Sequence, residues 1–233
     1  MPLLGAPGLT ATPDIPVERF RIWKSFPIWK VCYHDHMRPA SGLREQKKSE
    51  TKLALSRAAL ELALDRGDLA AVTVDDIADA VRVSARTFRN YFTSKEDAVL
   101  FSLRGIEDNA VALLRQRPQH EHVVDSLEAV MLDLATSEAF STTVAVTRLS
   151  AQNPGLAAHD AARSEDVGTV VLTEVSRRAG LDPDVDLYPR LVCNAAYAVL
   201  ATVIQLAVSG SKLSKDPGAL VAQGFQRLRD GLA

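Results

Sequence analysis

The sequence predicts an all-α protein in which a small helical domain precedes a larger one. After residue 42, apolar residues recur at three- and four-residue spacing, and no segment alternates apolar and polar residues as a half-buried strand does. Glycine and proline stand between these periodic segments, where they end helices. The 233 residues, 47% of them hydrophobic, suffice to bury a sizeable core.

The first 36 residues differ from the rest of the chain. They hold five of the eleven prolines and both tryptophans, without a helical or strand period, and they lack the basic start and apolar centre of a signal peptide. We therefore expect residues 1–36 to be a disordered extension, with Met37 as an alternative start of the protein. The cluster of Cys32, His34 and His36 offers three ligands on a flexible tail, too few to predict a metal site.

A long amphipathic helix is predicted over residues 44–66. Leu55, Ala59 and Leu62 form one apolar stripe, and Gly67 follows as a C-terminal stop. We expect this stripe to cover the two short helices that come next. The connection over residues 68–72 is expected to be a surface loop.

The segment TVDDIADAVRV, which begins at Thr73, predicts a short helix and a tight turn. Thr73 is a good N-cap, and Asp76 three residues later completes a capping box. Ile77 and Val81 are four residues apart and give this helix one apolar stripe. Val83, in the turn, adds a third contact to the core.

A second short helix is predicted over residues 85–91, with Ser84 as its N-cap and with Phe88 and Phe92 pointing inward. Arginine can pair with guanine and asparagine with adenine, while threonine and tyrosine can bond phosphates. The two helices therefore predict a helix-turn-helix that binds DNA. The residues that this arrangement leaves outside are Arg86, Thr87, Arg89, Asn90 and Tyr91.

Three segments between Gly42 and Leu100 resemble the tetracycline-repressor (TetR) family of one-component transcriptional regulators. They are GLREQKKSETKLALSRAALELALDRG, VTVDDIADA and VSARTFRNYFTSKEDAVL, and together they cover about a quarter of the chain. The resemblance implies a cytoplasmic, non-enzymatic homodimer that represses transcription. It implies a double-stranded palindromic operator, an unknown small-molecule effector that releases the protein from it, and no cofactor, metal or membrane.

Within this resemblance, we expect the outward residues of the second short helix to enter the major groove of DNA. Arg44 and Lys48 begin the first long helix and are expected to reach phosphate or the minor groove, with a solvated basic end as the alternative. Lys95 opens the fourth helix, whose N-terminus offers an anion site. The residues expected to contact DNA are Arg44, Lys48, Thr73, Ser84, Arg86, Thr87, Arg89, Asn90, Tyr91 and Lys95.

One residue departs from the family pattern, which has glycine in the turn where this chain has Arg82. A left-handed backbone conformation there costs a residue with a Cβ atom about 1 kcal/mol or more. We therefore expect the turn to be strained or slightly altered in shape. The helix-turn-helix itself is still predicted.

The charge distribution gives weak support to DNA binding. The net charge is −2, but residues 37–95 hold 11 Lys and Arg against 8 Asp and Glu, whereas residues 96–233 hold 12 against 18. The positive charge therefore lies with the helix-turn-helix. A random scatter of charges would often produce the same gradient.

Beyond the helix-turn-helix domain of residues 42–94, residues 95–233 predict a helical domain for ligand binding and dimerisation. The helix of residues 190–208 is apolar nearly all round, so we expect it to be buried on more than one side, in an interface or in the core. Its apolar run is interrupted by Thr202 and Gln205, and falls short of a membrane span. The predicted helices are 95–117, 122–136, 138–152, 156–179, 190–208 and 217–229. The resemblance implies that the last two of them join the homodimer.

A ligand pocket is expected in the larger domain, although most inward residues there can equally be core. Met131 and Phe140 are proposed as apolar lining, and Arg148 and His159 as polar anchors, with a surface arginine and a capping histidine as the alternatives. The full set of inward candidates is Leu103, Ile106, Leu127, Met131, Leu134, Phe140, Val144, Thr147, Arg148, His159 and Val171.

Enzyme functions receive little support from the sequence. It contains no phosphate-binding loop, dinucleotide fingerprint, nucleophile elbow or zinc-protease motif, and the S-x-x-K match of Ser209 to Lys212 has no partner motif. Two cysteines predict no disulfide framework. Two alternatives to a ligand-responsive regulator remain, namely an architectural DNA-binding protein and a cofactor-free helical enzyme. Sequence-specific binding that a metabolite releases would favour the regulator.

Overall fold

A computed structural model describes residues 43–231, and every regular element in that range is helical. The all-α prediction is confirmed. Residues 1–36, the alternative start at Met37 and the cluster of Cys32, His34 and His36 lie outside the described residues. The elements are α1 (Leu43–Arg66), η2 (Leu69–Ala71), α2 (Val74–Ala80), α3 (Ala85–Arg89), α4 (Lys95–Gln116), α5 (Val123–Thr136), α6 (Ala139–Gln152), α7 (Pro154–Ala179), α8 (Leu187–Val208), η3 (Lys212–Lys215) and α9 (Pro217–Arg229).

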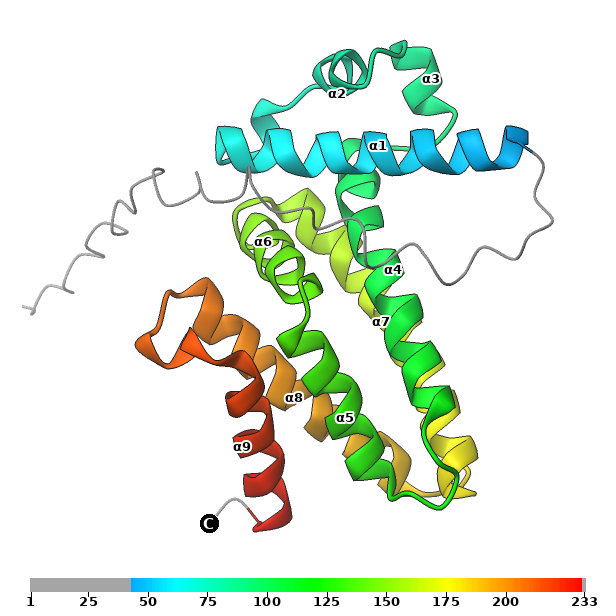
Figure 1. Cartoon of the computed structure of the whole chain (residues 1–233), viewed down its shortest axis with the longest axis vertical. Coiled ribbons are helices and arrows are strands. Elements are labelled where there is room, and N and C mark those ends of the chain that lie inside the picture. Colours follow the sequence, from blue (N-terminus) through cyan, green and yellow to red (C-terminus); the bar gives the residue numbers. More distant parts are fainter. Residues whose placement is uncertain (1–42, 232–233) are drawn as a thin grey trace, which may run out of the picture.

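The first three α-helices form a small bundle on top of α4. Figure 1 shows α1 lying across the upper end of α4, with α2 and α3 on the side of α1 that faces away from α5 to α9. Leu55 and Ala59 of the predicted stripe are fully buried, as is Ile77 of α2, and Phe88 of α3 is 1% exposed. The apolar stripe of α1 therefore forms the floor on which the helix-turn-helix rests.

Two clusters of buried side chains form the cores, and α4 contributes to both. Val99 and Leu103 belong to the upper cluster, and Leu114, about three turns beyond Leu103, belongs to the lower one. The upper cluster also includes Val146 of α6 and Leu156 of α7, which lie well beyond residue 95 in sequence. Packing thus continues across the predicted domain boundary.

The lower end of α4 is tied to α7 by one arginine. The Arg178 guanidinium donates to the carbonyl oxygens of Arg117 at 3.0 Å and of Pro118 at 2.6 Å, and to Ser126 Oγ at 3.0 Å. Carbonyl groups at the end of a helix have no partner within the helix, so this side chain supplies one. The junction of α4 and α5 is thereby fixed to α7.

Most helix boundaries agree with the sequence prediction, and two helices begin earlier than predicted. α7 begins at Pro154 and α8 at Leu187, whereas residues 156 and 190 were expected. Proline fits the first turn of a helix because its missing N–H would have no partner there. Pro154 therefore starts α7, and Pro189 is accommodated in the first turn of α8.

The connection over residues 68–72 is not merely a surface loop, which corrects the prediction. It contains η2, and both Leu69 and Val72 are 1% exposed. Asp68 caps this turn by accepting a hydrogen bond from the Ala70 N–H at 2.8 Å. The short segment packs two apolar side chains into the upper core while its backbone turns back toward α2.

Helix α8 is, among the described residues, the one helix long and apolar enough to cross a membrane by length and composition alone. The core helix of a soluble protein meets the same criterion. α8 packs against α5, α6, α7 and α9, and Figure 1 shows α9 alongside it. The two last helices approach closely, because a Cβ atom on Gly224 of α9 would lie 2.6 Å from Val199 Cγ1 of α8.

We predict that Gly224→Ala lowers the free energy of unfolding by about 1–3 kcal/mol, because the added methyl group overpacks against a stiff β-branched side chain. The matched control is Gly168→Ala in α7, where nothing lies within 4 Å of an added Cβ. That change should raise stability by roughly 0.5–1 kcal/mol through helix propensity. Urea unfolding followed by circular dichroism checks both. Equal effects of the two substitutions would contradict the close approach of α8 and α9.

Candidate nucleic-acid interface and ligand cavity

The start of α2 is held by the predicted capping box. Thr73 Oγ1 accepts from the Asp76 N–H at 3.1 Å, and Asp76 Oδ2 accepts from the Thr73 N–H at 2.9 Å. Arg66, the last residue of α1, donates to the same carboxylate at 2.7 Å and to the Ala71 carbonyl at 2.6 Å. The hydrogen bond from Arg66, together with those from Thr73, holds the pKa of Asp76 well below its ordinary value. Helix α2 is therefore fastened to the end of α1.

The turn between α2 and α3 has the geometry of a Schellman motif. The Val83 N–H bonds the Ala78 carbonyl and the Arg82 N–H bonds the Asp79 carbonyl, both at 3.0 Å. This pattern requires a left-handed residue just after the helix. Arg82 occupies that position with φ of +60°, the one positive φ among the non-glycine residues described. The turn thus has the shape that glycine usually provides, and Arg82 bears the strain that the sequence predicted.

Helix α3 is short, and its N-cap is the predicted Ser84. Ser84 Oγ accepts from the Thr87 N–H at 3.1 Å and lies 2.9 Å from Thr87 Oγ1. Phe88 and Phe92 are 1% and 2% exposed, with ring centroids 5.7 Å apart. The helix ends at Arg89, earlier than the predicted residue 91. Two buried rings and one cap therefore fix a helix that has little stability of its own.

The outward face of α3 carries three polar side chains. Arg86, Arg89 and Asn90 are exposed, and among residues 43–231 no hydrogen bond or ion pair holds their side chains. Thr87 and Tyr91 are only half-buried, and Tyr91 packs against the upper core. The exposed surface of α3 is therefore basic and polar, and its opposite side is anchored by phenylalanine.

The structure gives Lys95 a different environment from the one expected. Its Nζ donates to the carbonyl oxygens of Leu69 at 2.8 Å, Ala70 at 3.4 Å and Val72 at 2.9 Å. An ammonium group has three protons, and each has an acceptor here. Lys95 thus pins η2 to the start of α4 and, in this structure, leaves no proton for a phosphate.

The N-terminal part of α1 presents basic residues to solvent. Lys48 is exposed, while the side chain of Arg44 lies outside the described ones. One turn further on, Lys52 Nζ lies 4.4 Å from the ring centroid of Phe101 in α4 and 5.3 Å from that of Phe92. These cation–π contacts join α1 to α4 beside the recognition region.

An internal cavity of about 260 Å³ lies in the larger part of the chain, between α4, α5, α6, α7 and α8. Most of its wall is aliphatic. The structure places Met131 on this wall and, of the other inward candidates, Leu103, Ile106, Leu127, Leu134, Thr147 and Val171.

Three of the four residues proposed for the ligand site are not on the cavity wall. Phe140 is buried in the lower core, and Arg148 donates to the Val208 carbonyl at 3.2 Å. His159 is exposed and lines an outer groove instead. Val144 packs against the lower core. Helical spacing predicts which side of a helix is inward, but it does not tell a cavity wall from filled core, which is why Phe140 could not be placed from the sequence.

The polar part of the cavity wall consists of residues that the sequence analysis missed. Arg163 of α7 forms ion pairs with Glu107 of α4 and Asp160 of α7, and all three side chains are no more than 23% exposed. Tyr197 of α8 and Ser164 line the same space. A signal was present in the sequence, because Asp160 and Arg163 stand at i, i+3 in a predicted helix. The partner on α4 was not visible from spacing.

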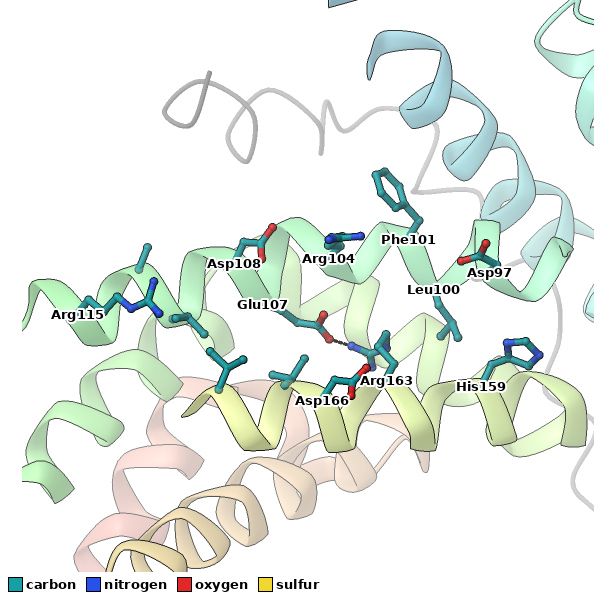
Figure 2. Close-up of a pocket in the computed structure, with 14 residues that line it drawn as sticks. Asp97, Leu100, Phe101, Arg104, Glu107, Asp108, Arg115, His159, Arg163 and Asp166 are labelled. Carbon is teal, nitrogen blue, oxygen red and sulfur yellow. Dashed lines mark ion pairs between the residues drawn. The ribbon is translucent and has the colours of Figure 1, made fainter. Parts of the chain in front are cut away.

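An open groove of about 650 Å³ runs along the outer seam of α4 and α7 (Figure 2). Figure 2 shows Glu107 and Arg163 facing each other across the seam, with Arg104 and Asp108 above and Asp166 below. Glu107 and Arg163 line both this groove and the internal cavity. Within the described residues, no group of three or more His, Cys, Asp or Glu side chains is arranged to hold a metal.

Comparison with known proteins links this architecture to a family of regulators. Residues 55–101 match the model described as "Bacterial regulatory proteins, tetR family", and residues 111–233 match the "MftR C-terminal domain". The HTH-type transcriptional regulator TcmR of Streptomyces glaucescens is 34% identical over 166 residues, covering 68% of this chain and 73% of that protein.

Two solved structures share the fold. A transcriptional regulator from Rhodococcus has a TM-score of 0.52 at 22% identity, covering 77% of this chain and 96% of that one. The fatty acid degradation regulator FadR from Bacillus halodurans has a TM-score of 0.57 at 21% identity, covering 78% and 96%. At these identities, the two structures speak for the fold alone.

We predict that Arg82→Gly raises the free energy of unfolding by about 1 kcal/mol, because glycine has no Cβ atom to strain at positive φ. The control Arg82→Ala keeps the Cβ atom and removes the same charge, so it should bring no gain. Thermal unfolding of the three proteins measures the difference. A gain of the same size for alanine would mean that charge, and not backbone strain, is responsible.

Proposed function

The chain belongs to the TetR family of bacterial regulatory proteins, and we propose that it is a homodimeric repressor that a small-molecule ligand releases from a palindromic operator. As a member of this family it is a DNA-binding transcriptional regulator and not an enzyme. Repression, the dimer and a cytoplasmic location are parts of the proposal.

The observation that carries the proposal is the outward face of α3. Arg86 and Asn90 are one helical turn apart and unpaired, on a helix whose other side is locked by Phe88. Arginine and asparagine are the side chains best suited to guanine and adenine edges in the major groove. In a dimer, two such helices would enter successive major grooves about 34–36 Å apart.

The other residues predicted to contact DNA are assigned different roles. Lys48 and Arg44 are assigned to the phosphate backbone from the start of α1, and Arg89, Thr87 and Tyr91 to the rim of the groove. Thr73 and Ser84 are the N-caps of α2 and α3, and they are assigned to phosphate contacts at these helix N-termini. Lys95 is assigned a supporting role, because its three hydrogen bonds hold η2 against α4.

The proposed dimer interface is the exposed face of α8 together with α9. Leu187 and Leu191 are 74% and 56% exposed, and this row continues through small and polar residues. Such a face is apolar at one end, permits close helix approach along the rest, and adjoins a groove between α8 and α9. A second copy of the same face would complete a four-helix contact. The exposed α8 residues of this row are Leu187, Leu191, Asn194, Ala198, Ala201, Thr202 and Gln205.

Ligand control is proposed to run through α4. This helix lines the cavity and also contributes Val99 to the core beneath the helix-turn-helix. A ligand that binds better to one placement of α4 shifts the equilibrium toward that placement, and so changes the spacing of the two recognition helices. Its leverage equals its differential affinity for the two forms, typically about 1–3 kcal/mol.

We predict that Arg86→Ala or Asn90→Ala weakens binding to the operator by about 1–3 kcal/mol and relaxes base preference at one position. Lys48→Ala should instead weaken binding to all DNA sequences alike. It should also reduce the slope of log affinity against log salt concentration by about one unit. Fluorescence anisotropy at two salt concentrations, with DNA from beside the protein's own gene and a shuffled duplex, measures both.

Lys215→Ala serves as the control for these substitutions, because Lys215 is an exposed lysine of η3, far along the chain from the helix-turn-helix. It should leave both affinities unchanged. Equal losses on specific and shuffled DNA for Arg86→Ala and Asn90→Ala would refute the assignment of base contacts. Binding that ignores sequence altogether would favour the alternative, a ligand-independent architectural protein.

We predict that Ala198→Arg converts the dimer to a monomer, because it places a charge at the centre of the proposed α8 face. Ala162→Arg on the exposed side of α7 makes the same chemical change outside that face and should leave the dimer intact. Sedimentation velocity at several concentrations distinguishes the two. If Ala198→Arg sediments as the wild type does, the subunits meet elsewhere.

A further inference from the structure

The polar cluster in the cavity joins two helices through a single guanidinium group. Arg163 of α7 contacts Glu107 of α4 and Asp160 of its own helix. Because Glu107 and Arg163 line both the outer groove and the internal cavity, a molecule in either space meets this pair (Figure 2). Both ends of the contact are largely shielded from water, at 19% and 23% exposure.

Part of the Arg163 guanidinium group makes no hydrogen bond. Arg163 Nε is buried and has no hydrogen-bond partner among the described residues. Burial also lowers the pKa of Arg163, because desolvation disfavours its charged form. An unpaired buried donor is costly, so a position in which the guanidinium gains another acceptor would compete with this one.

The charges around Arg163 argue against a charged ligand. Glu107 and Asp160 both contact the guanidinium, so its positive charge is already balanced by carboxylates. No positive charge is therefore left over for an anion, and a cation entering the cavity would meet the guanidinium that both carboxylates already contact. The remaining polar residues on the wall are neutral, namely Thr143, Thr147, Ser164 and Tyr197.

We propose that Arg163 is the ligand-recognition residue of this protein, and that the ligand is an uncharged amphiphile carrying a carbonyl-type acceptor on an apolar body. The acceptor takes a hydrogen bond from the Arg163 guanidinium, and the body fills the aliphatic part of the cavity around Met131 and Leu127. The ligand class rests on the cavity alone, whereas its effect on DNA rests on the proposed function.

This contact also supplies a route to the DNA-binding part. An acceptor in the cavity draws the guanidinium away from Glu107, and that ion pair is a link between α7 and the middle of α4. The link lies between the two core clusters to which α4 contributes. Loss of this ion pair makes the middle of α4 easier to displace. The contacts of Arg178 at the lower end of α4 stay in place.

The test uses two environment-sensitive dyes with the full chain in the absence of DNA. Prodan is uncharged and ends in a ketone, whereas anilinonaphthalene sulfonate has an apolar body and an anionic end. We expect prodan to bind with blue-shifted emission and the sulfonate to bind more weakly. Arg163→Met should weaken prodan binding by about tenfold or more through loss of a charged hydrogen bond.

Two further variants keep the proposal falsifiable if Arg163→Met folds poorly. Glu107→Gln leaves an acceptor oxygen but removes its charge, which weakens the competitor for the guanidinium and should tighten prodan binding. Arg177→Met removes another arginine of α7 that is ion-paired, with Glu174, but does not line the cavity, and should leave prodan binding unchanged. Wild-type protein that fails to bind prodan, prefers the sulfonate, or loses nothing in Arg163→Met would overturn the proposal, as would unchanged binding in Glu107→Gln.

A second measurement separates this proposal from the proposed function. Operator anisotropy is repeated with saturating prodan for the wild type and Glu107→Gln, and we expect the dye to release DNA from the wild type. If the dye affinities of the wild type and variants follow the expected order but the protein binds no operator, the repressor assignment fails and the ligand class stands. If DNA binds and the dye order is reversed, the ligand class fails alone.

Discussion

The structure depends above all on the position of α4 in two cores at once. A helix that is buried against α1 at one end and against α5 and α7 at the other cannot shift without disturbing both sets of contacts. Interiors packed to this degree have alternative discrete arrangements and not a continuum. A cavity beside the middle of such a helix is therefore well placed to influence the helix-turn-helix, while a cavity elsewhere in the larger part would have to act through additional helices.

The geometry of the DNA-binding part depends on contacts that anchor α2 and α3, because these two helices are too short to be stable alone. α2 depends on its capping box and on Arg66, which connects that box to the end of α1. α3 depends on Ser84 and on two phenylalanines, and removal of such a buried ring typically costs about 3–5 kcal/mol. Lys95 performs a related task by holding η2. The exposed residues of α3 are thereby presented on a rigid support, which the recognition of DNA bases requires.

The interior of the larger part combines two different uses of charge. Arg178 satisfies carbonyl oxygens at the end of α4 and so acts as a fixed tie. Arg163 is held by two carboxylates and, unlike Arg178, lines both the cavity and the outer groove. The Nε atom of each of the two arginines is buried without a hydrogen-bond partner among the described residues. The two arginines are on the same helix, four turns apart, and both reach the α4 side of the molecule. A bound molecule can therefore compete for the guanidinium in the middle of the α4–α7 seam, whereas the contacts of Arg178 lie at its end, away from both spaces.

The sequence by itself determined the local structure and the family. Caps, breakers and apolar spacing gave the helix-turn-helix and most helix boundaries, because these features act within one or two helical turns. Ser84, Phe88 and Arg82 could be interpreted for the same reason. Only the tertiary structure decided which inward residues border empty space, that Lys95 is occupied by η2, and that Glu107 meets Arg163. These outcomes depend on contacts between residues up to tens of positions apart, where helical periodicity carries no information about the partner.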